Sequence, residues 1–553
     1  MKDKSFHRLR VVDYYKTNWL KCIFNRFNLF KIISVCFVFL ILISPFSFEL
    51  PRAKAYENND FVVGMECNYE PFNWQTASAS STAVSIGSAG WCDGYDVQIS
   101  KIIANELNKK LVIKKIAWDG LQPALESGVI NAVIAGMTNT SERQNGIDFT
   151  TPYYSSDLTV IVRKNSKPAE FSNIQQFTNY KLMAQKNTIY DDVIDQIKGV
   201  VHQTPKESYP LLVYALQNDE TDGIVAEMPV AEGIIRSNHD LQVVKFIKNK
   251  GFQADTSVSI GLPKGTKNSS FFNQVQTALD KISLTKRKEL MLQAVMGDSN
   301  VTTDSNFSPQ TSGFIATSLW ILQNNWPLFL YGTEITILLA ILGTIFGFII
   351  GLVLGLGNSV QVKSHDSLLK TICKYILNIL IKFYVFVFRG TPMMIQAIFM
   401  FYVLRPVLYW EPLTAGLVVI SINTGAYMSE IIRSGIQSVD SGQRLAAQSL
   451  GMTLPKQLRY IILPQAIRNS FPSIGNQFIV NIKDSCVLNV IGVVDLYFQS
   501  NSISGSVMLF AQTFLITCVI YLILTFVAQI LLNFIERKIR LDGEIVSSME
   551  YSA

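Results

Sequence analysis

The alternation of apolar and polar positions divides the chain into two unlike parts. Beyond about residue 314, several apolar runs are long enough to cross a bilayer, for which roughly 20 residues suffice. We predict five membrane spans, at Gly332–Gly357, Phe383–Leu404, Pro412–Ile432, Phe471–Val494 and Val507–Phe534. Before residue 298, short buried strands alternate with helices, which is typical of parallel sheets covered by helices.

The N-terminal part has the pattern of an α/β domain with two lobes. Buried strands are predicted at Phe61–Gly64, Leu111–Ile116 and Ala132–Ile134, and helices at Tyr95–Leu107 and Leu121–Ser127. The expected fold is therefore a two-lobed α/β domain followed by an all-α membrane domain with five spans.

Two polar or interfacial segments separate these domains from each other and from the N-terminus. Asp298–Gly313 is rich in Ser, Thr, Asn and Asp and predicts a linker, and Trp320 and Trp326 mark an interfacial segment after it. At the N-terminus, a basic stretch precedes the apolar run Ile32–Phe46 and an A-x-A site at Ala53–Ala55. This pattern predicts a secretory signal peptide or an uncleaved signal anchor over residues 1–55.

Basic residues set the expected orientation, because cytoplasmic loops carry an excess of Lys and Arg. Lys and Arg gather after the first predicted span and after the last, at Lys363, Lys370, Lys374, Lys382, Arg389, Arg537, Lys538 and Arg540. We therefore expect a multi-pass protein of the cell membrane, with the α/β domain outside and the C-terminus in the cytoplasm. Within the first span, Gly343, Gly347 and Gly351 repeat at GxxxG spacing, which favours close helix packing.

Composition excludes several classes of function. The net charge of +6 comes mostly from the N-terminal stretch and the membrane-side loops, so it does not predict a nucleic-acid partner. Seven cysteines and four histidines show no metal-ligand spacing, and no nucleophile motif predicts an enzyme. Cys67 and Cys92 flank one long loop, either as a disulfide or as two unpaired apolar side chains.

A basic segment between two apolar runs, Gly442–Pro464, predicts two short helices broken at Gly451. Ser441 is expected to cap the first helix and Thr453 the second, with Pro455 in its first turn. On its residues alone, the segment is a handle for a soluble partner or an ordinary cytoplasmic loop with a solvated basic face.

GQRLAAQSLGM with IILPQA resembles the coupling loop of ABC importer permeases, in their polar amino-acid branch. VFRGTPMMIQ (Val387–Gln396) and NQFIVNIKDSCVLNVIGVVDL (Asn476–Leu496) are also similar to that family. The resemblance implies a coupling loop over 435–465 that contacts an ATPase subunit through the residues Gln443, Arg444, Ala446, Ala447, Gly451 and Pro464. The sequence departs from the family at Leu445, where a glutamate is usual.

Four stretches before residue 298 together resemble the type II periplasmic-binding-protein family for polar amino acids. They are Gly64–Trp74, Cys92–Leu107, Ala117–Arg143 and Asp148–Tyr154. The combined resemblance implies an extracytoplasmic amino-acid-binding domain over 56–298, a linker and interfacial segment over 299–330, and a permease domain over 331–545.

The family resemblance also implies a ligand site. Arg143 would grip the ligand carboxylate bidentately, helped by the Gly136 N–H, Thr138 and Thr188. Without the resemblance, Arg143 is simply a surface arginine. Glu227 would bind the α-ammonium, although it also reads as a solvated strand end.

Three further residues of that implied site concern the ligand side chain. Tyr69 and Trp118 would form its aromatic walls. Glu66 favours a basic ligand such as lysine, arginine, ornithine or histidine, with glutamine next.

Lys483 and Asp484 interrupt an apolar stretch. They either line a translocation path or form a pair at the cytoplasmic edge of the membrane.

No GxxxxGK[ST] phosphate loop occurs in the sequence, so ATP is expected at a separate subunit and no cofactor is expected on this chain. Five spans are few for a path, and the family forms dimers, so the expected assembly is a homodimer with an ATPase dimer. The predicted function is ATP-driven import of a polar amino acid. The alternative is an amino-acid sensor or ligand-gated channel.

Overall fold

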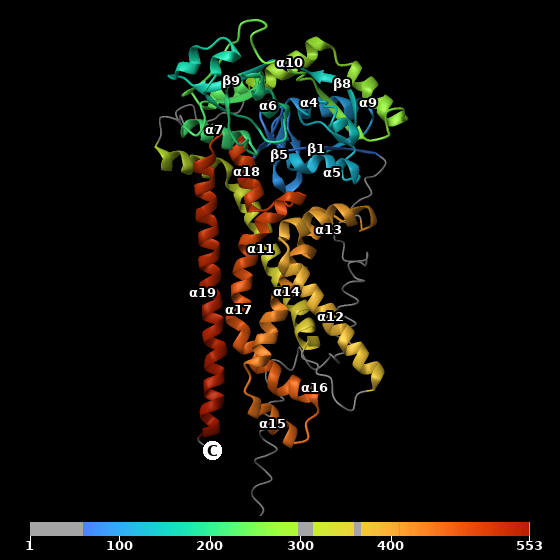
Figure 1. The fold of residues 1–553 in the computed structure, drawn as a ribbon, viewed down its shortest axis with the longest axis vertical. Coiled ribbons are helices and arrows are strands. Elements are labelled where there is room, and N and C mark those ends of the chain that lie inside the picture. Colours follow the sequence, from blue (N-terminus) through green and yellow to red (C-terminus); the bar gives the residue numbers. More distant parts are fainter. Residues whose placement is uncertain (1–58, 297–312, 359–366, 409, 552–553) are drawn as a thin grey trace, which may run out of the picture. The chain divides into compact units, whose positions relative to one another are not determined.

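The computed structural model describes residues 59–296, 313–358, 367–408 and 410–551. The predicted signal segment over 1–55 and nearly all of the polar linker lie outside these residues. The described residues fall into two compact units: one contains Ile345–Gly390 and Ser421–Ile474, and the other contains the α/β domain, the rest of Ala53–Thr344, Thr391–Ile420 and Gly475–Ala553. Figure 1 shows the elements in chain order by colour.

Lobe 1 of the α/β domain is a five-stranded sheet in the order β6-β1-β7-β14-β8. Its strands are β1 (Asp60–Met65), β6 (Lys110–Lys115), β7 (Ala132–Val133), β8 (Ile147–Tyr154) and β14 (Val258–Pro263). Its helices are α4 (Tyr95–Glu106), α5 (Leu121–Glu126), α9 (Ser270–Asp280) and α10 (Leu284–Met296). β1 pairs in parallel with β6 and β7, as the alternating pattern predicts, while the returning strand β14 is antiparallel.

Lobe 2 is a second five-stranded sheet in the order β11-β10-β12-β9-β13. Its strands are β9 (Leu158–Arg163), β10 (Lys181–Met183), β11 (Val201–His202), β12 (Gly223–Glu227) and β13 (Leu241–Val243). Its helices are α6 (Ile189–Asp192), α7 (Tyr209–Gln217) and α8 (Met228–Ser237). The chain crosses between the lobes twice, after β8 and before β14, so the two crossings form a hinge.

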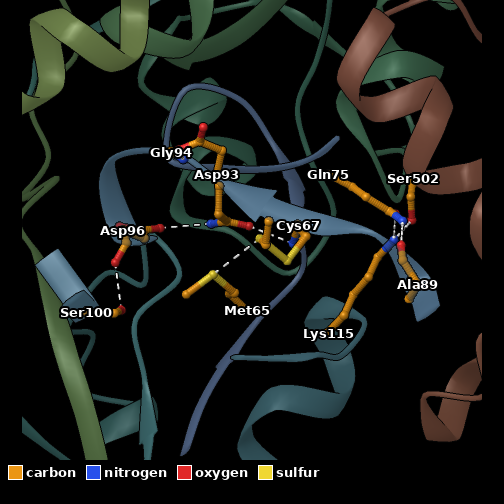
Figure 2. Close-up of a disulfide and its surroundings, with 12 residues drawn as sticks. Met65, Cys67, Gln75, Ala89, Asp93, Gly94, Asp96, Ser100, Lys115 and Ser502 are labelled. Carbon is orange, nitrogen blue, oxygen red and sulfur yellow. Dashed lines mark hydrogen bonds between the residues drawn. A yellow bond between two sulfur atoms is a disulfide. The ribbon is translucent and has the colours of Figure 1, made fainter. Parts of the chain in front are cut away.

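A small sheet, in the order β2-β3-β5-β4, extends lobe 1. Its strands are β2 (Asn68–Tyr69), β3 (Asn73–Thr76), β4 (Val84–Ser85) and β5 (Trp91–Asp93). Cys67 and Cys92 form a disulfide with their Cα atoms 5.8 Å apart, and Figure 2 shows it beside Met65. The sequence left open a disulfide or two unpaired cysteines, and the interpretation as unpaired cysteines is therefore wrong. The disulfide closes the base of the loop that follows β3.

The membrane part is helical. Its helices are α11 (Phe314–Asn358), α12 (Leu368–Gly390), α13 (Met393–Leu408), α14 (Pro412–Gln437), α17 (Leu463–Asp484), α18 (Leu496–Val507) and α19 (Phe510–Tyr551). Among the described residues, four helices are long and apolar enough to cross a membrane, within α11, α12, α14 and α19. The predicted interfacial segment is not separate, because α11 begins at Phe314 and runs on through Pro327.

Two of the five predicted spans differ from the observed helices. Phe383–Leu404 is divided between α12 and α13 at Thr391 and Pro392, because proline disfavours helical backbone in the residue before it. Phe471–Val494 is also not one span. α17 ends at Asp484, and a 3₁₀ helix over Ser485–Ile491 then closes at Gly492, whose φ of 84° is left-handed.

The GxxxG repeat of α11 packs closely, as predicted, and the structure shows that its partner is α14. A Cβ at Gly347 would lie 2.5 Å from Thr424, and one at Gly351 would lie 2.3 Å from Met428. Since real Cβ atoms do not approach so closely, only glycine allows the two helices this separation. The repeat therefore fixes helix packing.

The segment Gly442–Pro464 contains the predicted first helix and its stop, but it differs from the prediction at both ends. α15 (Ser441–Ser449) is capped by Asp440, whose carboxylate accepts from Gly442 N at 2.7 Å, so the predicted cap at Ser441 is wrong by one residue. Gly451 has the left-handed φ of 71° expected of a helix stop. Thr453 precedes α16 (Leu454–Gln457), which continues through a π-helical turn into α17 and is not a separate short helix.

Candidate ligand-binding site

A small cavity of about 10 Å³ lies between the two lobes. Its walls come from the carboxyl ends of strands and from the segments after them, where loops bring polar groups together. The residues that line it are Glu66, Tyr69, Trp118, Gly136, Thr138, Arg143, Gln185, Thr188 and Tyr190. Seven of the eight residues predicted for the ligand site are in this set, and Glu227 is the exception.

Arg143 lies where the two lobes meet. Its guanidinium donates to Thr138 O in lobe 1 and to Asn187 O in lobe 2, both at 3.0 Å, and lies 5.1 Å from the centre of the Trp118 ring. The sequence alone also allowed a solvated surface arginine, but this side chain is half-buried and held in place. A guanidinium has five N–H donors in a planar fork, and a fork fixed in this way has a geometry that suits a carboxylate.

Gly136 lines the cavity but does not offer the backbone donor predicted for it. Its N–H donates to the Tyr153 hydroxyl at 3.0 Å, and that hydroxyl in turn donates to Asp96 at 2.7 Å. The requirement for glycine is conformational and steric, since its φ is 60° and a Cβ would lie 2.9 Å from the Tyr69 ring. The prediction of a free N–H at Gly136 is therefore wrong.

Glu227 ends β12 and is fully buried in lobe 2, so the alternative of a solvated strand end is wrong. Its carboxylate accepts from the Tyr190 hydroxyl and from Ser156 Oγ, the latter at 2.9 Å. Burial raises the pKa of Glu227 to about 7, although both hydrogen bonds act in the opposite direction. Tyr190 lines the cavity, and Glu227 lies behind Tyr190. The Tyr190 hydroxyl therefore connects the Glu227 carboxylate to the cavity wall.

Glu66 follows β1 and lies at the lobe 1 side of the cavity. Its Oε1 accepts from Trp118 N at 3.2 Å. Burial raises the pKa of Glu66 to about 7, and the nearby Lys115 ammonium acts in the opposite direction. The two acids thus approach the site from different lobes and with different partners.

Aromatic rings form much of the cavity wall. Tyr69 stacks on Phe72 with ring centroids 5.2 Å apart and on Tyr209 of lobe 2 at 5.7 Å. Phe72 is fully buried behind Tyr69. Tyr69, predicted as a wall, therefore forms part of the contact between the lobes.

The lobes are closed over the cavity. Asn187 Nδ2 of lobe 2 donates to Asp119 Oδ1 of lobe 1 at 3.1 Å, beside the bond from Arg143 to Asn187 O. At the hinge, Ser156 N and Thr256 Oγ1 lie 3.4 Å apart, and Ser156 also bonds Glu227. The acid of lobe 2 is thus bonded directly to the hinge.

Sequence reasoning missed Gln185 and Tyr190. Both stand close to Thr188, which was predicted, and all three follow the buried strand β10. The available signal was positional, because side chains just beyond the carboxyl end of a sheet strand line the crevice there.

The other predicted residues lie outside this cavity. In α15, the side chain of Gln443 accepts a hydrogen bond from Gln465 Nε2 at 2.8 Å, and Ala447 is buried. Leu445 in this helix is 62% exposed, and Leu450, just after it, is 80% exposed. The exposed pair presents an apolar surface on this segment. Lys483 and Asp484 are the last two residues of α17, and both are exposed.

Two family models match the chain. Residues 61–293 match bacterial extracellular solute-binding proteins, family 3, and residues 374–541 match the binding-protein-dependent transport system inner membrane component. The first match covers both lobes and the cavity, and the second runs from within α12 to within α19 and includes the segment Gly442–Pro464.

The named permease relatives agree with the second match. The glutamine transport system permease protein GlnP of Escherichia coli (strain K12) is 34% identical over 218 residues, covering 39% of this chain and 94% of that protein. The arginine transport system permease protein ArtQ of Bacillus subtilis (strain 168) is 34% identical over 160 residues, or 29% of this chain and 73% of that protein. An arginine-bound substrate-binding protein, AbpA of Streptococcus pneumoniae, is 23% identical with a TM-score of 0.38 and covers 43% of this chain and 95% of that one.

The two matching families, extracellular solute-binding proteins and an inner membrane component, are transport components and not enzymes. The chain belongs to the permease family of polar amino-acid ABC importers, and it carries a solute-binding domain of family 3 fused to its permease part.

Proposed function

We propose that the chain imports a polar amino acid, capturing it between the lobes and passing it through the membrane helices with energy from a separate ATPase subunit. One observation carries the proposal: a held guanidinium, Arg143, lines the cavity from lobe 1, and a buried carboxylate, Glu227, stands directly behind Tyr190 on the lobe 2 side. A free amino acid carries the complementary carboxylate and ammonium. Closure around both groups therefore selects for the amino acid itself.

The preferred side chain is proposed to be basic, with glutamine next. Glu66 is the acid at the side of the cavity away from Glu227, and Tyr69 and Trp118 supply aromatic surface for an aliphatic or cationic stem. Among the relatives, one is named for glutamine transport and one for arginine transport.

The energy source is proposed to be an ATPase dimer in the cytoplasm, which holds the ATP. The exposed Leu445 and Leu450 of the segment Gly442–Pro464 suit an apolar cleft of such a partner. With this segment inside, the α/β domain lies outside. Two copies of the chain would form the complete path, and Lys483 and Asp484 are proposed to line it.

The test is calorimetric titration of the purified full chain with each free amino acid. We expect binding in the micromolar range or tighter for a basic amino acid, glutamine or both. Binding of neither would contradict the proposed substrate class and would favour a sensor of another ligand. Light scattering on the same sample measures whether two copies associate.

A further inference from the structure

The end of strand β6 carries a lysine whose ammonium is buried against a membrane helix. Lys115 is only 8% exposed, and its Nζ donates to Gln75 Oε1 of β3 and to Ser502 Oγ of α18. The same ammonium lies 4.7 Å from the centre of the Phe498 ring. Figure 2 shows Lys115, Gln75 and Ser502 meeting in the vicinity of the disulfide.

The surroundings of Lys115 form a close contact between lobe 1 and this helix. Gln75 Nε2 donates to Gln499 Oε1 of α18 at 2.8 Å. A Cβ at Gly505 would lie 2.8 Å from Asn68 in β2, so α18 approaches this strand at backbone distance. We call the set Asn68, Gln75, Lys115, Gln499, Ser502 and Gly505 the α18 contact.

A second lysine of the same strand makes a different contact. Lys114 Nζ pairs with Glu411 Oε2 at 3.0 Å. Both lysines thus face membrane-part residues, but Lys114 has a carboxylate partner. In the part of the chain that the structure describes, Lys115 forms no ion pair with a carboxylate. Burying an ammonium without an ion pair is costly, so its neutral partners in the α18 contact must hold it.

Lys115 is also next to the ligand cavity. It pairs with Met65 across strands β6 and β1, and Glu66 is the next residue after Met65. Two residues after Lys115 the chain reaches Ala117 and then Trp118, whose N–H donates to Glu66. Burial lowers the pKa of Lys115 well below its usual value, and the nearby charge of Glu66 acts in the opposite direction. One side chain therefore lies between α18 and two residues of the cavity wall.

We propose that Lys115 is a positioning residue of transport, which ties α18 to the Glu66 and Trp118 side of the cavity when lobe 1 lies against the membrane part. The proposal rests on the amino-acid transport proposed above. It assigns Lys115 as the residue that links binding of the amino acid between the lobes to its passage through the membrane helices. The ligand contacts the cavity, whereas Lys115 contacts α18. Loss of Lys115 therefore impairs passage far more than capture.

The first test compares uptake with binding in Lys115→Met and in the matched control Lys110→Met. Lys110 starts the same strand and is exposed. For the amino acid found by calorimetry, we expect Lys115→Met to lower the maximal uptake rate at least about tenfold while affinity falls no more than about threefold. Lys110→Met should match the unaltered chain, and Lys115→Arg should recover part of the rate. Unchanged uptake, or equal losses of uptake and affinity, would overturn the proposal.

The second test reports the contact itself and needs neither the ATPase nor the ligand. Lys114→Cys and Glu411→Cys are introduced in a chain whose free cysteines are replaced by serine, and a short bismaleimide joins them. We expect Lys115→Met to lower the yield of joined peptides, measured by mass spectrometry, at least about threefold, because the neighbouring anchor is lost. An unchanged yield would overturn the proposal. If the chain binds no amino acid, the proposed function fails, and this yield still decides whether Lys115 holds the contact.

Discussion

The two acids at the cavity, Glu66 in lobe 1 and Glu227 in lobe 2, have the same raised pKa but different surroundings. Both pKa values are about 7, and burial is the main cause of each. Glu227 accepts hydrogen bonds from two hydroxyls of the binding domain, Tyr190 and Ser156. Glu66 accepts one backbone hydrogen bond and feels the charge of Lys115, which faces α18.

This difference suits two tasks: binding the α-ammonium, which all amino acids share, and binding the side chain, which varies among them. Every amino acid has an α-ammonium, and an acid enclosed by its own lobe and bonded to the hinge suits that group. The side chain varies, and Glu66 lies near the buried Lys115, whose surroundings include α18. We infer that Glu227 selects amino acids as a class, whereas Glu66 selects among them.

The largest expected effect concerns Arg143, the proposed partner of the ligand carboxylate. Arg143→Ala should weaken binding of every amino acid at least about a hundredfold, because a bidentate charged hydrogen bond to the carboxylate is lost. Arg143→Lys should recover part of the affinity, since it restores the charge without the planar fork. Calorimetry measures both, with Gln144→Ala at the next, exposed residue as the control. A loss below about threefold would place the carboxylate elsewhere.

Replacing Glu227 should have the next largest effect on affinity. Glu227→Gln should weaken binding about thirtyfold for basic amino acids and glutamine alike, because the α-ammonium loses a buried charge partner. The control Glu232→Gln changes an exposed acid on the adjoining helix α8 and should have no effect. Should the loss appear with only one class of side chain, Glu227 would not be the ammonium acid.

Replacing Glu66 should have a smaller effect on affinity, and one that depends on the ligand side chain. Glu66→Gln should weaken binding of arginine or lysine about tenfold but change glutamine binding no more than about twofold, because only the basic side chains lose a charge partner. The comparison of ligands on one variant is its own control for folding. A tenfold loss with glutamine as well would assign Glu66 a general role.

The smallest effect is on stability and depends on pH. A carboxyl whose folded pKa is raised from 4.5 to about 7 binds more protons folded than unfolded in this window, so the folded state loses stability as pH rises through it. Thermal unfolding of the full chain without amino acid should therefore occur a few degrees lower at pH 8 than at pH 5.5. Glu227→Gln should reduce the difference. A higher unfolding temperature at pH 8 would contradict the buried, raised acids.

Sequence reasoning predicted the parts of the fold that depend on pattern and on family motifs. Strands β1, β6 and β7 of lobe 1, the close helix packing at Gly347 and Gly351, and the helix stop at Gly451 follow from local periodicity and glycine geometry. The predicted spans were wrong where helices end for local reasons. Pro392 divides one span, and α17 ends at Asp484 before the apolar pattern does.

At the site, motifs located the residues but not their hydrogen-bond partners. The Gly136 N–H was expected to face a ligand, yet it bonds Tyr153, which lies 17 residues further along the chain. Tyr190 was missed because its relation to Glu227 joins two segments that only the folded lobe brings together. Nor does any local pattern distinguish Lys115 from Lys114, because their different partners lie in α18 and at Glu411.

One measurement tests the division between the two acids most directly. The full chain, Glu227→Gln and Glu66→Gln are each titrated by calorimetry with arginine, with its analogue lacking the α-amino group, and with norvaline, which lacks the guanidinium. The account predicts that the loss caused by Glu227→Gln disappears for the deaminated analogue, and that the loss caused by Glu66→Gln disappears for norvaline. If each variant instead loses the same factor with all three ligands, the two acids have no separate functions, and the account is contradicted.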